Sequence, residues 1–262
     1  MKKFILFIGS VLASSLLYAQ DDAAALAKKL ANPVASLISV PFQNNTDYGI
    51  GDYNGTRNTL NIQPVIPIGI SEDWNLIGRV VLPVITQYDI YAPGTKQSGL
   101  SDAVVSTFLS PKESKNGLTW GVGPVFLVPT GTDELLTTKK FGVGPTAVIL
   151  KQANGVTYGA LVNQIWSVAG DADRADVNQM FLQPFVTYNW PSGAGLGCNM
   201  ELTQNWQAST SNIWLNPTVS GLTSLGKQKV SLAIGPRFNI AAPDGQQADW
   251  GWRAVVIFLF PK

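Results

Sequence analysis

Two glycine-rich motifs are the first residues in this sequence that suggest chemistry. The letters GVGP occur at 121–124 and again at 142–145. Glycine loops bind phosphate when they lie between a strand and a helix, where backbone N–H groups and the helix N-terminus point at the anion. Both motifs instead run directly into β-type sequence, "VFLV" and "TAVIL", and neither opens a helix. We therefore interpret them as two neighbouring strands whose glycines point inward and whose prolines point outward.

An acidic stretch, "GDADRAD", suggests a calcium loop, because it brings Asp171, Asp173 and Asp176 together within six residues. A calcium loop of the EF-hand kind has glycine at its sixth position and glutamate at its twelfth. Counted from Asp171, those places hold Asp176 and Leu182. The stretch is therefore interpreted as a solvated loop, and no metal ligand is assigned.

The residue types that are missing exclude several classes of site. The chain has no histidine, which removes Ser-His-Asp and Cys-His catalysis, histidine metal sites and the commonest general base. The lone Cys198 excludes an internal disulfide and a cysteine zinc site. A net charge of +1 gives no signal for nucleic acid. We expect no catalytic residue, no cofactor and no nucleic-acid partner.

The first residues, "MKKFILFIGSVLASSLLYAQDD", have the pattern of a secretory signal. Two lysines precede an apolar run that is too short for a transmembrane helix, and the small residue Ala19 follows it. We expect a signal peptide at 1–19. The next stretch, 20–34, predicts a short helical segment that Pro33 ends.

From 35 to 262 the sequence alternates between apolar and polar residues. In "GLGCNMELTQNW", for example, Leu196, Cys198 and Met200 share one phase while Asn199 and Glu201 share the other. About twelve strands of this kind are expected, near 35–43, 57–68, 73–86, 101–110, 118–129, 140–152, 155–168, 177–190, 194–206, 213–223, 229–240 and 249–260. Most are ten residues or longer, which suits membrane-spanning β-strands of about 9–11 residues better than soluble strands of about 5–6.

Connections and aromatic residues agree with a transmembrane barrel. The odd-numbered connections, such as "TGTDELLTTK", are mostly longer than the even-numbered ones, such as "ANG", as in outer-membrane barrels. The large aromatics predict two interfacial bands. One band lies at the short-turn ends (Trp74, Trp120, Tyr158, Tyr188, Trp190), and the other at the long-loop ends (Tyr88, Trp166, Trp206, Trp214, Trp250, Trp252).

The polar phase of such a barrel faces its lumen, so charged residues in mid-strand become functional candidates. We expect the three arginines to oppose the one glutamate across the lumen, with amides and a threonine completing the pore lining. Packing within the lumen and selection of a solute are both open as their role. The predicted pore-lining residues are Arg79, Arg237, Arg253, Glu201, Asn199, Asn216, Asn239, Gln63, Gln183 and Thr203.

Proline is the one residue type that conflicts with this assignment, because it cannot donate to a sheet ladder. Several prolines fall in mid-strand in the outward phase, whereas Pro83 breaks that phase. We expect bulges or strand bends at these positions, which the adjacent glycines would permit.

Several phrases of the sequence resemble the MetA-pathway of phenol degradation family. They include "NTLNIQPVIPIGISEDWNLIGRVVLPVI", "WGVGPVFLVPTGTDELL", "FGVGPTAVILKQ", "YGALVNQIWSVAGD", "FLQPFVTYN" and "ADWGWRAVVIFLFPK", and the likeness extends over nearly the whole mature chain. The resemblance implies a Gram-negative outer-membrane barrel that is often labelled a transporter. It also implies uptake of aromatic or other hydrophobic compounds, and it brings no catalytic motif.

The sequence thus predicts an all-β fold, an antiparallel transmembrane barrel that contacts outer-membrane lipid and acts as a porin-like channel or transporter. One alternative is a secreted soluble β-sandwich that binds a ligand. A second is an outer-membrane enzyme, which the absence of histidine and of a Gly-x-Ser-x-Gly elbow disfavours. The solute remains open.

The N-terminal helical segment is expected to serve the barrel. Its small apolar stripe, Ala23, Leu26, Ala27 and Leu30, is too small to bind a membrane strongly. We predict that it docks in or beneath the periplasmic mouth and narrows the pore, with its two lysines turned to water or to lumen carboxylates. The alternative is a frayed tail.

Overall fold

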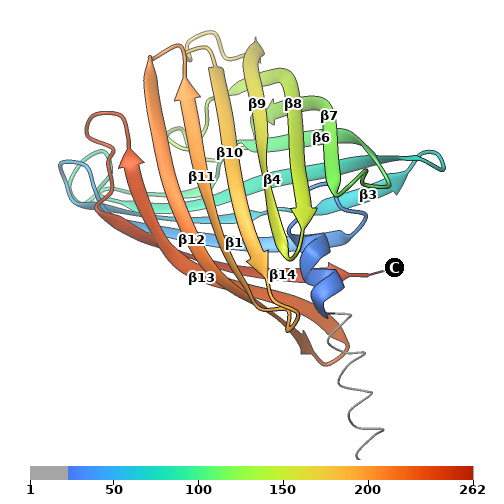
Figure 1. Cartoon of the computed structure of the whole chain (residues 1–262). Helices are drawn as coiled ribbons and strands as arrows, with labels where there is room; N and C mark the ends of the chain where they lie inside the picture. The colour runs from blue at the N-terminus through green and yellow to red at the C-terminus, as the bar shows by residue number, and fades with distance from the viewer. Residues whose placement is uncertain (1–22, 262) are drawn as a thin grey trace, which may run out of the picture.

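A computed structural model of the protein describes residues 23–261; the predicted signal peptide, 1–19, lies outside them. Fourteen strands form one antiparallel sheet, which closes on itself because the last strand pairs with the first (Figure 1). The strands are β1 (Ile38–Ile50), β2 (Gly55–Ile62), β3 (Val65–Gly69), β4 (Trp74–Tyr88), β5 (Lys96–Leu100), β6 (Ala103–Pro111), β7 (Leu118–Val128), β8 (Lys140–Ala153), β9 (Val156–Gly170), β10 (Asn178–Asn189), β11 (Gly195–Asn205), β12 (Thr210–Leu225), β13 (Gln228–Ala241) and β14 (Trp250–Phe260).

Two of the barrel's crossings are each made of two short strands. β2 and β3 both pair with β4 and are separated only by Gln63 and Pro64; β5 and β6 likewise both pair with β4. The fourteen strands therefore make twelve crossings, which confirms the predicted twelve-stranded barrel. The continuous pairing from β14 to β1 contradicts the β-sandwich alternative, because a sandwich would keep open edges.

The mid-strand prolines lie where the hydrogen-bond ladder pauses. Between β12 and β13, pairing stops after Leu215↔Phe238 and resumes at Val219↔Ile234 in the same register, and Pro217 and Pro236 fall in the gap. The β8–β9 and β6–β7 ladders skip residues in the same way beside the two GVGP motifs. Of the predicted bulges or strand bends, bulges are therefore wrong at these prolines, since a bulge would shift the register. The register shifts of these ladders lie a few residues away, at Phe141/Gly142 and at Ile213/Trp214.

The glycines of the motifs explain how the chain bends at these pauses. A Cβ placed on Gly123 would lie 1.9 Å from the carbonyl oxygen of Thr107, and one on Gly144 would lie 1.7 Å from that of Gln164. Glycine is needed because the neighbouring backbone occupies the space of a side chain. The motifs are structural, as the sequence predicted.

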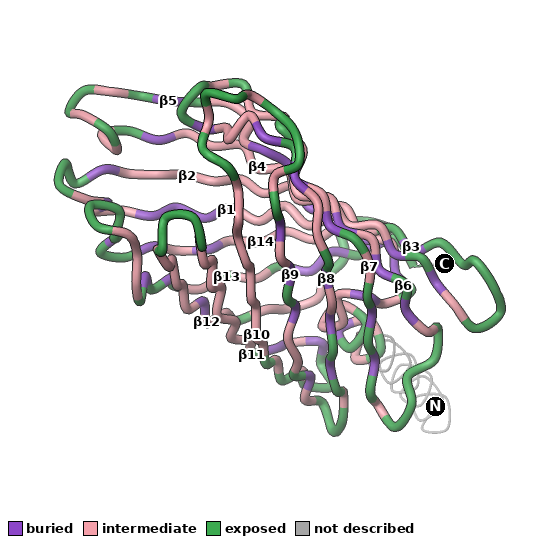
Figure 2. The backbone as a smooth tube through the Cα atoms, turned by 90° about the horizontal axis from the view of Figure 1, so that it is seen from above, coloured by how far each residue is buried: buried purple, intermediate pink, exposed green. Residues whose placement is uncertain are grey.

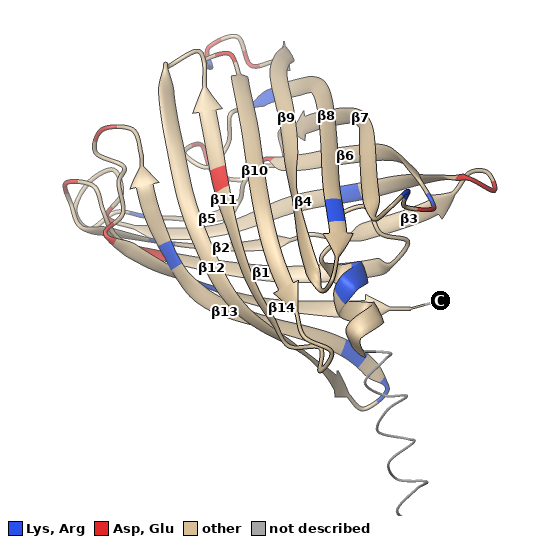
Figure 3. Ribbon diagram, in the orientation of Figure 1, with Lys and Arg blue, Asp and Glu red and all other residues tan. Residues whose placement is uncertain are grey.

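The outer surface of the barrel is apolar, and the predicted aromatic bands lie on it with one exception. Large apolar side chains are exposed on the outward phase of most strands, from Leu76 to Ile240. Charged residues lie mostly in the connections (Figure 3). Trp214 is the exception: the register pairs it with Glu201, so it faces the lumen. Its assignment to the long-loop band is wrong.

The two ends of the barrel differ as expected. The connections 70–73, 112–117, 154–155, 190–194 and 226–227 define the short-turn end, and 51–54, 89–95, 129–139, 171–177, 206–209 and 242–249 define the long-loop end. Exposed residues concentrate in these connections, as the burial colouring shows (Figure 2). The first loop is shorter than predicted, because β1 continues through the polar stretch "NNTDYGI" to Ile50.

A helix at 23–30 lies at the short-turn end, against the connections of that end (Figure 1). Its Lys28 carbonyl accepts a hydrogen bond of 2.8 Å from Gln152. Ala27 of the predicted stripe is buried, whereas Lys28 and Lys29 are exposed. No helix within 23–261 is long and apolar enough to cross a membrane.

Candidate functional site: the barrel lumen

The lumen contains two clusters of different character. One, the ionic cluster, consists of Asp47, Glu201, Arg237 and Arg253, from β1, β11, β13 and β14. The other, the apolar cluster, is formed by buried aliphatic and aromatic residues of β4, β6, β8 and β9 together with one residue of the N-terminal segment (Val34, Ile77, Phe108, Val148, Leu150, Leu161). The lumen is therefore polar on one side and apolar on the other.

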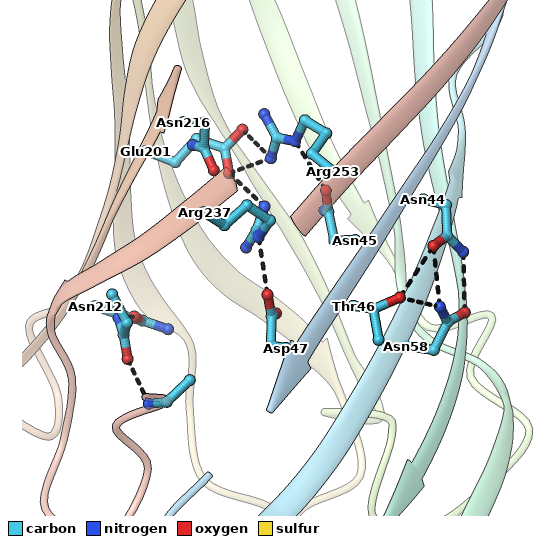
Figure 4. A network of polar contacts seen from close by, with 12 residues as sticks. Asn44, Asn45, Thr46, Asp47, Asn58, Glu201, Asn212, Asn216, Arg237 and Arg253 are labelled. Atoms are coloured by element: carbon cyan, nitrogen blue, oxygen red, sulfur yellow. Dashed lines mark hydrogen bonds and ion pairs between the residues drawn. The ribbon is translucent and has the colours of Figure 1, made fainter. Parts of the chain in front are cut away.

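The ionic cluster is held by short, charge-assisted contacts (Figure 4). Arg253 donates to both carboxylate oxygens of Glu201, at 2.9 and 3.0 Å, and Arg237 donates to Asp47 at 2.9 Å. Arg237 also lies 3.8 Å from Glu201. Because both arginines and Asp47 are buried, losing one partner would leave a charge without compensation. The cluster joins β1 to β11 across the closure of the barrel.

Neighbouring side chains complete the ionic cluster. Arg253 donates to Asn45 at 2.8 Å, and the guanidinium of Arg237 stacks over the Trp214 ring, 4.2 Å from its centre. Asn216 donates to Asn199 at 2.9 Å. The Nη1 atom of Arg237 is buried without a hydrogen-bond acceptor among the described residues. The cation–π contact with Trp214 partly compensates this lost hydrogen bond, because the face of an aromatic ring attracts a cation.

The apolar cluster lies at the short-turn end of the lumen. Val34 enters it from the N-terminal segment and is only 3% exposed. The segment is fixed beside it by Ser36, whose hydroxyl accepts a bond of 2.7 Å from Asn75 of β4. Phe181 and Phe185 of β10 pack on the cluster's edge. These two residues break the alternation of their strand in sequence, and the structure explains this, since both are apolar residues in the inward phase.

Three cavities follow one another through the lumen. The first, of about 420 Å³, lies at the long-loop mouth beneath Leu135 and Leu136. It shares Val104, Ile165 and Gln179 with a central cavity of about 220 Å³. The central cavity in turn shares Gln63, Arg79 and Gln183 with a third, of about 260 Å³, whose wall includes residues 29–33. Neighbouring cavities thus share lining residues from the long-loop mouth to the N-terminal segment.

Two lumen arginines differ from those of the ionic cluster. Arg79 of β4 donates to Gln63 at 2.9 Å, and Arg57 of β2 donates to Gln87 at 2.8 Å. Within residues 23–261 neither has a carboxylate at ion-pair distance. Arg79 lines the central cavity and Arg57 lines the mouth cavity.

The structure places all ten predicted pore-lining residues on the inward face, but it does not join them as expected. Glu201 contacts Arg237 and Arg253, whereas Arg79 bonds Gln63 instead. Gln183 donates weakly to Glu201 at 3.3 Å, and Asn239 donates to Asn212 at 3.1 Å. Thr203 shares the inward face through its pairing with Phe181 and Asn212.

Sequence reasoning missed Asn45, Asp47 and Trp214. The first two fall in the stretch interpreted as a loop, and Trp214 was placed outside. Alternation gave no signal there, because "QNNTD" is polar in both phases; only its position directly after a predicted strand, in the phase of Gln43, points to Asn45 and Asp47.

The long-loop mouth is organised by one buried carboxylate. Asp102 accepts hydrogen bonds of 2.6 Å from the hydroxyls of Thr137 and Thr138 and from the Thr138 backbone. These bonds hold the connection 129–139 over the mouth cavity, where Leu136 is buried. The mouth is therefore partly covered by an ordered loop.

The acidic loop behaves as a solvated rim. Asp171 accepts from the backbone of Asp173, and Asp176 pairs with Lys140 at 3.0 Å. Within residues 23–261 no group of three or more His, Cys, Asp or Glu residues is arranged to hold a metal. The hydrogen bond from Lys140 is the main reason that the pKa of Asp176 lies below its usual value, and one from Ser167 adds to it.

A small polar patch faces outward on β1 and β2. Asn44 and Asn58 exchange hydrogen bonds of 3.0 Å, and Asn58 also donates to Thr46 at 2.7 Å (Figure 4). The three side chains satisfy one another, which lowers the cost of placing them on an apolar surface.

Solved structures of outer-membrane proteins are similar to this barrel. The COG4313 outer membrane channel from Pseudomonas putida F1 is similar with a TM-score of 0.68 at 16% identity, over 87% of this chain and 97% of that one. The chain has the fold of a Gram-negative outer-membrane β-barrel. A Pseudomonas aeruginosa FadL homologue is a more distant match, with a TM-score of 0.41 at 9% identity over 86% of this chain and 89% of that one.

No family model matches the chain, and no curated protein matches it. Its outer-membrane setting agrees with the apolar outward face, the two aromatic bands and crossings of 11 residues or more in its unbroken strands. The barrel of this outer-membrane protein thus presents its polar residues to the lumen and its apolar residues to lipid.

Proposed function

We propose that this protein is a passive outer-membrane channel for small aromatic or other hydrophobic solutes, closed from within by residues 31–37. The observation that carries the proposal is the series of three cavities, which runs from the long-loop mouth to the N-terminal segment. A barrel filled only for packing would have little reason to keep such a series. The segment lies where the series would otherwise reach the short-turn end.

The apolar side of the lumen supports the choice of solute. Leu161, Ile165 and Phe181 line the central cavity together with amides such as Gln63 and Gln183. A molecule with an apolar body gains by leaving water for such a wall, at roughly 25 cal/mol per Å² of apolar area buried. The resemblance to the phenol degradation family, and the absence of a catalytic histidine, favour the same conclusion and a protein that is not an enzyme.

Single-channel recording of two deletions tests the proposal. Removing residues 23–36 takes away the helix and Val34, and it should raise the conductance of the full-length barrel. Removing residues 23–30 is the matched control, because it leaves Val34 and Ser36 in place, and it should raise the conductance much less. Equal conductance in all three proteins would contradict the closure.

Liposome swelling tests the solute class with the same proteins. The barrel without residues 23–36 should admit phenol and small sugars. The full-length barrel should admit phenol faster than the larger arabinose after the rate into protein-free liposomes is subtracted for each solute. A full-length barrel that admits arabinose as fast as phenol would contradict the assignment of hydrophobic solutes.

A further inference from the structure

The central cavity contains a charged group that the passage of neutral solutes does not require. Arg79 is half-buried and points into the cavity, and its one hydrogen bond within residues 23–261 goes to the amide oxygen of Gln63. A guanidinium has five N–H donors in a fixed fork. Most of this fork is therefore available to a molecule in the cavity.

The carboxylates of the lumen are already engaged elsewhere. Glu201 lines the same cavity but accepts two bonds from Arg253 and lies 3.8 Å from Arg237. Asp47 accepts from Arg237. Because two arginines compensate these two carboxylates, the charge of Arg79 is left for an anion from outside.

The rest of the cavity wall combines an apolar part, formed by Val81, Val104, Leu161, Ile165 and Phe181, with a larger number of polar side chains, mostly amides. At about 220 Å³ the cavity lies below the ~300–1,000 Å³ of pockets for drug-sized ligands. That size suits a molecule with one ring or a short chain. An apolar body beside these residues would bring a terminal carboxylate to the open side of the guanidinium.

We propose that Arg79 makes the central cavity a binding site for small amphipathic monocarboxylates, of which benzoate is the simplest aromatic example. Guanidinium and carboxylate match as a planar, bidentate pair. Gln63 orients Arg79 by taking one donor, and the apolar part of the wall favours carboxylates that carry an apolar body. This inference rests on the proposed channel, whose solute class it narrows.

Calorimetric titration of the full-length barrel in a non-ionic detergent tests the site directly. Three probes are compared: benzoate, benzyl alcohol as its neutral counterpart, and acetate as a carboxylate without a ring. Wild type should bind benzoate about tenfold or more tightly than either of the others, because a hydrogen bond to a charged group in a partly desolvated site is worth at least that factor. Benzyl alcohol bound as tightly as benzoate would overturn the proposal, and this comparison needs no variant.

Substitution identifies the residue. Arg79→Gln should weaken benzoate binding about tenfold and leave benzyl alcohol binding unchanged, while Arg79→Lys should restore part of the loss. Arg57→Gln, which removes the arginine of the mouth cavity, is the matched control and should bind benzoate as wild type does. Equal loss in both variants, or no loss in Arg79→Gln, would overturn the assignment to Arg79.

Binding and passage are measured separately, so the two proposals fail separately. Benzoate binding that depends on Arg79 in a barrel whose conductance never responds to loss of residues 23–36 would contradict the channel alone. A barrel that opens on that deletion but does not prefer benzoate would contradict the carboxylate site alone.

Discussion

The two sides of the lumen are stabilised by different interactions, ion pairs on one side and apolar packing on the other. The ionic cluster joins β1, β11, β13 and β14 across the seam where the sheet closes, with contacts of 2.9–3.0 Å between charged groups. The apolar cluster has no such directional contacts and instead buries Val34 among aliphatic and aromatic side chains. Directional contacts fix the register of strands, whereas apolar packing admits a segment that can leave without stranding a charge.

The difference between the ionic and the apolar cluster indicates which contacts cost less to break. Removing Val34 from its cluster exposes apolar surface only, at a cost that grows with area. Separating Arg253 from Glu201 would leave two charges in a buried place. The proposed channel therefore opens at the N-terminal segment, with the ionic cluster expected to stay in place.

Glu201→Ala should have the largest effect on stability. Arg253 and Arg237 would both lose their contact with this carboxylate, and breaking a buried ion pair costs about 3–5 kcal/mol. The free energy of unfolding in urea, followed by tryptophan fluorescence in micelles, measures it. Glu113→Ala, in an exposed turn, is the control and should change stability by less than about 0.5 kcal/mol. Similar losses of unfolding free energy in both variants would contradict the claim that Glu201 stabilises the barrel more than an exposed glutamate does.

Phe108→Ala should cost slightly less, about 3 kcal/mol, because it empties the centre of the apolar cluster. It should also raise single-channel conductance, which Glu201→Ala should not do while folded, since only the apolar side holds the segment. Leu109→Ala changes the next residue of β6, which is exposed, and serves as control. If Phe108→Ala left the conductance unchanged, the claim that the apolar cluster holds the N-terminal segment in place would be contradicted.

Gly123→Ala probes the strand bend behind the apolar side. Its new Cβ would lie 1.9 Å from the Thr107 carbonyl oxygen, so β6 or β7 must shift, at about 1–3 kcal/mol. Gly221→Ala is the matched control, because nothing lies within 4 Å of its Cβ. Unfolding in urea compares the two, and equal stability would show that the close approach is unimportant.

The Lys140–Asp176 pair at the rim should have the smallest effect, and it should depend on pH. The folded pKa of Asp176 is lowered, so its contribution to stability is present above the unfolded pKa of ~3.9 and is lost as the pH falls through the lower folded value. Asp176→Asn should be slightly less stable than wild type at pH 7, and the difference should disappear near pH 2. A difference that persists at pH 2 would mean that the carboxylate charge is not its cause.

The sequence was sufficient for the barrel and insufficient for its interior. Period-two alternation, strand length and connection length predict all twelve crossings, because lipid on one side and water on the other impose that pattern on every strand. The same pattern failed at β1, where both phases of Asn44–Asp47 are polar: one phase joins the ionic cluster and the other forms the outward amide patch.

Contacts across the lumen could not be predicted in the same way. Alternation places Arg79, Arg237 and Arg253 inward, but only the tilt and closure of the strands decide which of them reaches Glu201. The apolar cluster was hidden for a similar reason. Phe181 and Phe185 are apolar exceptions in the polar phase of β10, and they pack on a cluster formed by four other strands and Val34, residues that are distant from β10 in sequence.

The prolines illustrate a third limit. Their conflict with the ladder was evident in sequence, yet the solution, a pause in pairing with no change of register, depends on the approach of the neighbouring strand to a glycine. Sequence shows that a bend is needed, and only the sheet shows what kind it is.

A reversible cross-link between the N-terminal segment and the barrel wall tests the central claim most directly. A Cβ on Gly121 would lie 3.4 Å from Val34 Cγ1, so Val34→Cys and Gly121→Cys are placed to form a disulfide in a Cys198→Ser background. The account predicts low single-channel conductance while the disulfide is intact, and higher conductance with openings after reduction, approaching that of the barrel without residues 23–36. A cross-linked barrel that conducts as well as the reduced one would contradict closure by this segment.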